Sequence, residues 1–505
     1  MAVEPGRPPH RVLITLSVML ASIMQALDNT IANVALPRIQ GSLSATQDQM
    51  AWVLTSYIIA AAIMTPLSGW LAGQVGRKRV FLFSVVGFTV ASALCGLAQS
   101  LPEIVAARLL QGLCGAALIP MSQAVLLDIN PPEQHAKAMA IWVMAVTIGP
   151  ILGPALGGWL TEQYNWRWVF YINVPFGILA FAGILSFMPE TVIRKSRFDF
   201  VGFAALSVAI GAFQLMLDRG QLKDWFSATE IWVEAIVAGT AFYLFVVHML
   251  TTSKPAFVSP ALFKDRNFLT GNLFIFIVGV VLFATLALLP PLLQDLLNYP
   301  VVLTGFVTAP RGIGTLMAMV IVSRLMGKVD TRYIIATGFG LTAVSLWQMT
   351  GFYLQMDMAP VIWSGLAQGL GTGFVYVPLA AITFATLSPQ YRNEGTALFS
   401  LIRNLGSSIG ISVVETLLTR NTQTMHARLA EQVTPYGETM RAHASALSGL
   451  GGLAALNHSV TEQAAMIAYN NDFKLMMILT LCAVPLVVLL RSGRATPADE
   501  IVVVE

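Results

Sequence analysis

Charged side chains are scarce in this sequence of 505 residues, of which only 11% are Asp, Glu, Lys or Arg. Soluble domains usually carry about 25% charged residues. Hydrophobic residues make up 56% of the chain, and water could not solvate a surface of that composition, so lipid must be the solvent for most of it. The apolar runs last about 20 residues without alternating with polar ones, which excludes a β-barrel and predicts membrane-spanning helices.

Several kinds of chemistry are missing from the sequence. The three cysteines, Cys95, Cys114 and Cys482, all fall within apolar runs, so no disulfide framework of external loops is expected. The six histidines show no metal-binding spacing, and the chain has neither a glycine-rich phosphate loop nor a nucleophile elbow. We therefore expect a protein that is not an enzyme, is not driven directly by ATP, and uses no metal or organic cofactor.

Long apolar runs recur along the whole chain. Each is long enough to cross a hydrocarbon core of about 30 Å as a helix that rises about 1.5 Å per residue. The first run is too long for the core of a cleaved signal peptide and is expected to remain as an anchor. We predict an all-α membrane protein with fourteen transmembrane helices, over 12–36, 51–72, 80–99, 103–126, 137–160, 168–188, 200–217, 229–250, 271–294, 303–325, 333–352, 359–380, 395–418 and 473–490.

The positive charges orient these helices. An even number of helices places both termini on one side, and that side carries more than twice as many Lys and Arg residues as the other. This excess predicts that both termini are cytoplasmic. The stretch 419–472, between the last two predicted helices, would then be a long external loop without a strand pattern. It would be either a solvated connector with some helix, or a docking or gating element.

Five short motifs occur in order along the chain. They are LDNTIANVALP at 27–37, GWLAGQVGRKR at 69–79, RLLQG at 108–112, GPILGPALGG at 149–158 and WRWVFYINVPFG at 166–177. Together they resemble the major facilitator superfamily, and specifically its fourteen-helix drug:proton antiporter branch, over nearly the whole chain. Within that branch the similarity is greatest to the inner-membrane pumps of tripartite multidrug efflux systems.

This resemblance implies a domain organisation and partners. It implies a cytoplasmic N-terminus at 1–11, two six-helix bundles at 12–188 and 271–490, two linker helices within 189–270 and a cytoplasmic tail at 491–505. The substrate cavity would lie between the bundles near the midplane. The resemblance also implies a bacterial inner-membrane location, protons as the coupling ions, and a periplasmic adaptor and an outer-membrane channel as partners.

One motif departs from the family pattern. Where the family usually has an acidic residue in the loop after the second helix, this chain has Gly73. That acid normally pairs across the cytoplasmic gate, so a charge-paired gate is not expected at this loop. The residues that correspond to the gate loop are Gly69, Gly76, Arg77, Lys78 and Arg79.

Asp28 is the most informative residue of the sequence. It lies in the outer half of the first helix, where a carboxylate is costly and is usually retained because it faces a cavity or a partner. Arg108 lies at a matching depth in the fourth helix, and Gln111 follows one turn later on the same face. We predict an interaction of Asp28 with Arg108, direct or through water, that takes part in proton coupling. The alternatives are a structural pair at Asp28 and an Arg108 that snorkels to the interface.

Other residues inside the helices are candidates for coupling or for the cavity. Glu415 lies near the outer end of its helix and would be a second proton site, a contact for cationic substrates or an interfacial carboxylate. Arg403 should face the interior of the C-terminal bundle, and Arg311, between a proline and a glycine, indicates a local irregularity. The predicted cavity residues are Gln25, Asn33, Tyr57, Gln111, Trp142, Arg403 and Asn404.

The fifth helix contains a glycine and proline pattern. Small residues let helix backbones approach closely, and proline weakens the local hydrogen-bond ladder. In the family this pattern is the antiporter motif, and its association with export rather than uptake follows from the resemblance alone. Its residues are Gly149, Pro150, Gly153, Pro154, Gly157 and Gly158.

The whole sequence predicts a proton-coupled multidrug exporter that moves hydrophobic or amphipathic compounds by alternating access. Asp28 would bind the proton, Arg108 would tune it, and the glycine-rich helix would let the bundles close. The alternatives are an uptake carrier, an exporter of a specific metabolite or lipid, and a membrane receptor or scaffold without transport. The buried charges argue against a scaffold, which has little need of them.

Overall fold

A computed structural model describes residues 10–45, 47–131, 134–190, 193, 197–252, 256–388, 391–433 and 450–490. Helices account for nearly all regular structure in these ranges, within which the one β-type pairing is an isolated bridge between Met326 and Val329. The all-α prediction is therefore confirmed.

The N-terminal part forms one helical bundle. Its helices are α1 Arg11–Leu43, α2 Gln47–Val75, α3 Arg77–Leu97, α4 Leu101–Gly115, α5 Leu118–Ile129, α6 His135–Gln163, α7 Trp168–Tyr171 and α8 Asn173–Phe187. Helices α4 and α5 together make a single membrane crossing, as do α7 and α8. Helix α1 packs against α6 and α8, and α4 packs against α2 and α3, so α1 and α4 both lie inside the bundle.

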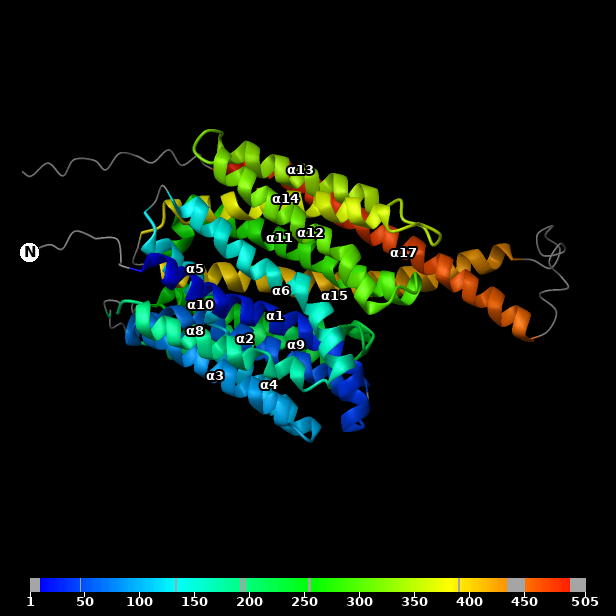
Figure 1. The fold of residues 1–505 in the computed structure, drawn as a ribbon, viewed down its shortest axis with the longest axis horizontal. Coiled ribbons are helices and arrows are strands. Elements are labelled where there is room, and N and C mark those ends of the chain that lie inside the picture. Colours follow the sequence, from blue (N-terminus) through cyan, green and yellow to red (C-terminus); the bar gives the residue numbers. More distant parts are fainter. Residues whose placement is uncertain are drawn as a thin grey trace, which may run out of the picture.

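The C-terminal part repeats this arrangement after two linker helices, α9 Phe200–Gly220 and α10 Thr229–Thr251. Its helices are α11 Arg266–Pro291, with a π-helical turn at Leu292–Leu296, α12 Val301–Leu325, α13 Thr331–Met349, α14 Ala359–Ala385, α15 Arg392–Gln432 and α17 Leu450–Leu486. Short 3₁₀ turns occur at Trp225–Ser227, Pro260–Lys264 and Val487–Leu489. Helix α9 contacts both α2 and α15, so the linker pair lies along the line where the bundles meet (Figure 1).

Twelve helical segments among the described residues are long and apolar enough to cross a membrane. The other two predicted spans, 137–160 and 333–352, are helical within α6 and α13 but are not among the twelve. The chain is therefore a multi-pass membrane protein, and the number fourteen stays a prediction.

The stretch predicted as a loop at 419–472 is mostly helix where the structure describes it. Helix α15 has 41 residues, about 60 Å at 1.5 Å per residue, and continues to Gln432. Helix α17 begins at Leu450, and His426 Nε2 lies 3.0 Å from Asn457 Oδ1, so the two extensions contact each other. Both run past the other helices at the end far from the start of α1 (Figure 1). The predicted helix ended at 418, where polar residues begin, but no glycine or proline lies between Gly410 and Pro435 to end a helix, so α15 continues into the predicted connector.

Among the described residues, four helix pairs make the main contacts between the two bundles. Helix α6 packs against α12 and α14, while α2 and α5 pack against α15. At Gly69 of α2 a methyl group would meet the backbone of Asn393 and Glu394 near the start of α15. The bundles are thus in close contact near the end that carries the start of α1.

Candidate functional site

Asp28 lies at the centre of a buried polar cluster in the N-terminal bundle, and its residue is 0% exposed. Its Oδ2 accepts a hydrogen bond from Arg108 Nη1 at 2.7 Å. Its Oδ1 accepts from Gln111 Nε2 at 2.9 Å and from Asn173 Nδ2 at 2.7 Å. The expected contact of Asp28 with Arg108 is therefore direct, and the carboxylate ties α1 to α4 and α8.

Arg108 is as deeply buried as its partner, with 1% of the residue exposed. Its Nη1 also donates to Gln111 Oε1 at 2.8 Å, and its Nε donates to the carbonyl of Val53 at 3.2 Å. The ring of Tyr57 lies 4.5 Å from the guanidinium carbon, at a cation–π distance. The guanidinium is thus enclosed by protein and does not snorkel to an interface.

Asn173 and Ser92 belong to the cluster, although they were not among the predicted site residues. Asn173 Nδ2 also donates to Ser92 Oγ at 2.9 Å, and Ser92 Oγ donates to the carbonyl of Phe170 at 2.9 Å. Asn173 is 0% exposed at the first residue of α8. The available signal was an asparagine within an otherwise apolar stretch, which in lipid needs an internal partner.

This arrangement suits a carboxylate that exchanges a proton. An ionised carboxylate accepts hydrogen bonds only, and Asp28 receives three from side chains. A protonated Asp28 carries a hydrogen that needs an acceptor of its own, and it no longer supplies the counter-charge of Arg108. Since a buried cation without a partner is strongly disfavoured, gain or loss of one proton must rearrange the cluster.

The glycines of the fifth predicted helix, now α6, pack against the turn of α1 that carries Asp28. A methyl group at Gly149 would overlap the backbone of Ala26 and Leu27, and one at Gly153 would overlap the side chain of Thr30. Gly157 packs in the same way one turn later, Gly158 is buried beside it, and the side chains of Pro150 and Pro154 lie outside the described residues. The small residues therefore allow the close α1–α6 contact.

An arginine of the gate loop does form an ion pair, although Gly73 replaces the acidic residue usual in the family. This corrects the expectation that the loop would lack a charge pair. Arg77, at the start of α3, forms an ion pair with Asp128 of α5. Asp128 also pairs with Arg392, at the start of α15 in the other bundle, at 3.0 Å. The acid thus comes from another helix rather than from the loop itself.

The other gate-loop residues have different roles. Gly76 caps α3 with φ of 93°, a conformation that favours glycine. Arg79 lies 4.0 Å from Glu190, an exposed and therefore weak pair. Lys78 follows Arg77 in the first turn of α3.

The predicted cavity residues fall into two groups. Gln25 Nε2 donates to the hydroxyl of Tyr57 at 3.4 Å, so both adjoin the Asp28 cluster, as Gln111 does. The ring of Trp142, 0% exposed on α6, lies 6.0 Å from that of Tyr376 on α14, across the junction of the bundles. The Tyr376 hydroxyl accepts from Arg403 Nη1 at 2.9 Å.

Asn404 and Asn33 are the remaining predicted cavity residues. Asn404 Oδ1 accepts from Arg403 Nη2 at 3.2 Å, so Asn404 belongs with the group at the bundle junction. Asn33 lies in α1, and its side chain is outside the described residues.

Glu415 lies apart from both groups, towards the extended end of α15. It is an exposed residue, and the carboxylate of Asp218 on α9 lies close enough to repel its charge. Asp218 Oδ1 accepts from Gln214 Nε2 at 2.9 Å. Two carboxylates therefore face each other between α9 and α15, a neighbour for Glu415 that the sequence did not reveal.

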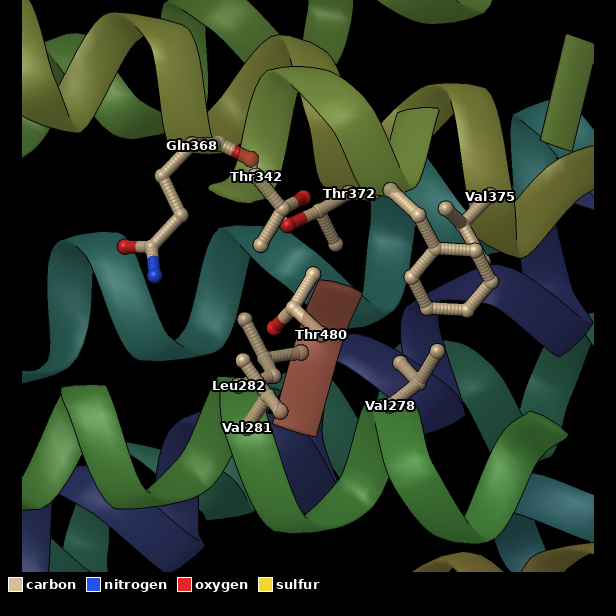
Figure 2. A pocket seen from close by; sticks show the side chains of 9 residues that line it. Val278, Val281, Leu282, Thr342, Gln368, Thr372, Val375 and Thr480 are labelled. Atoms are coloured by element: carbon tan, nitrogen blue, oxygen red, sulfur yellow. Dashed lines mark hydrogen bonds between the residues drawn. The ribbon is translucent and has the colours of Figure 1, made fainter. Parts of the chain in front are cut away.

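A small cavity lies in the C-terminal bundle, away from Asp28. It leaves about 20 Å³ for the centre of a water molecule, which is room for one water. Figure 2 shows side chains of α11, α13, α14 and α17 converging on it, among them Thr342, Gln368 and Thr480. Gln368 Nε2 donates to Thr285 Oγ1 at 3.2 Å, whereas Gln368 Oε1 is buried without a partner.

Comparisons with known proteins agree with this architecture. Residues 18–411 match the family model described as Major Facilitator Superfamily. The chain is 37% identical to the multidrug export protein EmrB of Escherichia coli (strain K12), over 93% of each chain. It is also 37% identical to the fatty acid resistance protein FarB of Neisseria gonorrhoeae, over 94% of this chain and 95% of that one. Among solved structures, the human organic anion transporter MFSD10 superposes with a TM-score of 0.60 at 15% identity, covering 94% of this chain and 100% of that one.

Proposed function

Because this chain belongs to the major facilitator superfamily, we propose that it is a proton-coupled exporter of hydrophobic or amphipathic compounds that works by alternating access. The observation that carries this proposal is the fully buried Asp28, which is bound to Arg108, Gln111 and Asn173. A carboxylate that joins three helices through its charge couples its protonation to their packing.

Protonation of Asp28 changes the hydrogen bonds that hold α1, α4 and α8 together. Protonation of Asp28 removes the counter-charge of Arg108, which then moves toward other acceptors, such as the carbonyl of Val53 that it already contacts. Release of the proton restores the three bonds. Each proton that moves inward supplies about 2.3 kcal/mol per 100 mV of membrane potential, besides the contribution of the pH gradient.

Helix α6 transmits this change to the junction of the bundles. Its Gly149 and Gly153 lie against the turn of α1 that holds Asp28, and its Trp142 lies against Tyr376 of the other bundle. A shift of α1 is therefore passed along a closely packed helix to the surface where the bundles meet. Close packing of this kind favours movement of whole elements over local deformation.

The names of the relatives support a proposal for the substrates of this protein. One relative is named for multidrug export and another for fatty acid resistance, and both names fit cargo with a large apolar part. We place the protein in the bacterial inner membrane with both termini in the cytoplasm, as the distribution of Lys and Arg favours. A periplasmic adaptor and an outer-membrane channel would carry the cargo onward, and the projecting pair of α15 and α17 offers a surface for the adaptor (Figure 1).

Transport by purified protein in liposomes tests the coupling. We expect an imposed pH gradient to drive movement of a lipophilic dye against its concentration gradient in wild-type vesicles. Asp28→Asn keeps the shape of the side chain but removes its charge, and should abolish uphill movement. Asp224→Asn, at an exposed carboxylate, is the matched control and should transport normally.

Two results would refute the proposal. One is uphill transport by Asp28→Asn at the wild-type rate. The other is dye movement in wild-type vesicles that does not respond to the pH gradient or to the membrane potential.

A further inference from the structure

Two arginines are buried in the C-terminal bundle without an acidic partner. Arg311 of α12 is 8% exposed and Arg403 of α15 is 6% exposed. Among the described residues neither lies within ion-pair distance of a carboxylate. Helices α11 to α14 contain no Asp or Glu at all. The buried Asp472 of α17 is not within ion-pair distance of either arginine, so the charges of Arg311 and Arg403 lack a close counter-charge, whereas the charge of Arg108 in the N-terminal bundle is balanced by Asp28.

The contacts of these two arginines are with neutral acceptors. Arg311 Nη2 donates to the carbonyl of Leu282 at 3.4 Å, a long bond. Arg403 donates to the Tyr376 hydroxyl at 2.9 Å and to Asn404 Oδ1 at 3.2 Å. A guanidinium has five N–H donors and stays protonated at every physiological pH. It therefore cannot lower the free-energy cost of its burial by losing its charge. A cation at this depth is costly without a counter-charge.

The backbone of Arg403 and the side chain of Arg311 contact neighbouring turns of α11. A methyl group at Gly279 would meet the carbonyl of Arg403, and Leu282, which accepts from Arg311, follows three residues later on the same face. Leu282 also lines the cavity of Figure 2, together with Gln368. Positive charge, an unpartnered amide oxygen and apolar wall residues thus adjoin one stretch of α11.

We propose that Arg311 and Arg403 bind the anionic head of an amphipathic substrate, a carboxylate on an apolar chain, within the C-terminal bundle. Carboxylates match the planar donor fork of a guanidinium, and the apolar faces of the bundle suit the chain. Glu415 does not neutralise this site, since it lies twelve residues farther along α15, about 18 Å away. This inference rests on the proposed export function, and it specifies in addition that the exported compound is an anion.

Equilibrium binding to full-length protein in lipid nanodiscs tests the inference. The probes are laurate, dodecanol and dodecyltrimethylammonium, whose apolar chains are of nearly equal length and whose head groups are anionic, neutral and cationic. We expect wild-type protein to bind laurate at least about tenfold more tightly than dodecanol at a pH where laurate is ionised, because hydrogen bonds to charged groups are strong. Dodecyltrimethylammonium should bind no better than dodecanol.

The ratio of laurate to dodecanol affinity separates a lost head-group contact from general damage to the bundle. Arg311→Gln and Arg403→Gln should each lower this ratio about tenfold, and Arg311→Lys should keep part of it, because it keeps the charge. Arg324→Gln, on the exposed end of the same helix α12, is the matched control and should leave the ratio unchanged.

A wild-type ratio near one, or a ratio that neither glutamine variant changes, would overturn the inference. Binding is measured without a gradient, so its outcome is independent of the coupling experiment. Uphill export of dodecyltrimethylammonium but not of laurate would leave the export function standing and refute the anion site. Loss of uphill transport for every probe would refute the export function instead.

Discussion

Asn173 shows how a single neutral side chain can hold a charged site in place. It donates to Asp28 at 2.7 Å and to Ser92 at 2.9 Å from a fully buried position. Asn173→Leu has a similar volume but removes both bonds, so it should lower the free energy of unfolding by about 1–3 kcal/mol. Thermal unfolding of purified protein in detergent measures this loss. Asn471→Leu, at an exposed position of α17, should have little effect, and equal stability of the two variants would contradict the role given to Asn173.

Asp199 supplies a pH-dependent contact at the start of α9. Burial alone would raise its pKa, but hydrogen bonds from the N–H groups of Gly202 and Phe257, and from His248, hold the pKa of Asp199 below its usual value. A carboxyl whose folded pKa is depressed stabilises the protein above its unfolded pKa, near 4, and loses this contribution as the pH falls through the folded pKa. Asp199→Asn should therefore be less stable than wild type at pH 7, and the difference should shrink below about pH 4. Unfolding temperatures measured from pH 7 to pH 3 check this, and a difference that does not vary with pH would refute it.

At the scale of helices, the contact of α6 with α1 depends on glycine. A methyl group at Gly149 has no room beside Ala26 and Leu27, whereas one at Gly239 of α10 meets nothing within 4 Å. Gly149→Ala should therefore destabilise the protein by about 1–3 kcal/mol through overpacking. Gly239→Ala, in an open helix position, should be neutral or slightly stabilising. Unfolding of both variants in the same detergent gives the comparison, and similar stabilities would show that α6 can move away from α1 at no cost.

Sequence patterns predicted the helices and part of the site because depth in a membrane can be counted along a helix. Asp28 and Arg108 lie at similar depths, and the structure joins them at 2.7 Å. Counting along a helix does not give its rotation or its neighbours. Asn173 and Asp128 were therefore missed, since their contacts depend on how α8 and α5 pack against other helices. The extensions of α15 and α17 were missed because hydropathy reports the end of the lipid contact rather than the end of the helix.

At the scale of the whole molecule, the two bundles differ in whether their buried arginines have an acidic partner. The N-terminal bundle pairs Arg108 with Asp28 inside a complete set of hydrogen bonds. The C-terminal bundle leaves Arg311 and Arg403 with neutral acceptors. A protein built this way can bind a proton in one half and an anion in the other. Movement of the two halves against each other would then expose both sites to the same side of the membrane.

That movement must break an ion pair that joins the bundles near the start of α1. Asp128 of α5 pairs with Arg77 of its own bundle and with Arg392 of the other, at 3.0 Å. Its side chain is 33% exposed, so the link should contribute about 1 kcal/mol, which corresponds to about a fivefold change in the ratio of closed to open forms. Asp128→Asn should therefore raise the share of protein that is open at this end.

Spin labels at Arg79, on α3, and Arg324, on α12, report the opening in a background without the native cysteines. The distribution of distances between them should gain a longer component in Asp128→Asn, because the substitution removes the charge that both arginines share. Asp357→Asn, at an exposed position between α13 and α14, is the matched control and should leave the distribution unchanged. If the distribution is the same in all three proteins, helix packing alone holds this end closed, and the contacts of α2 with α15 rather than the ion pairs set the barrier to rocking.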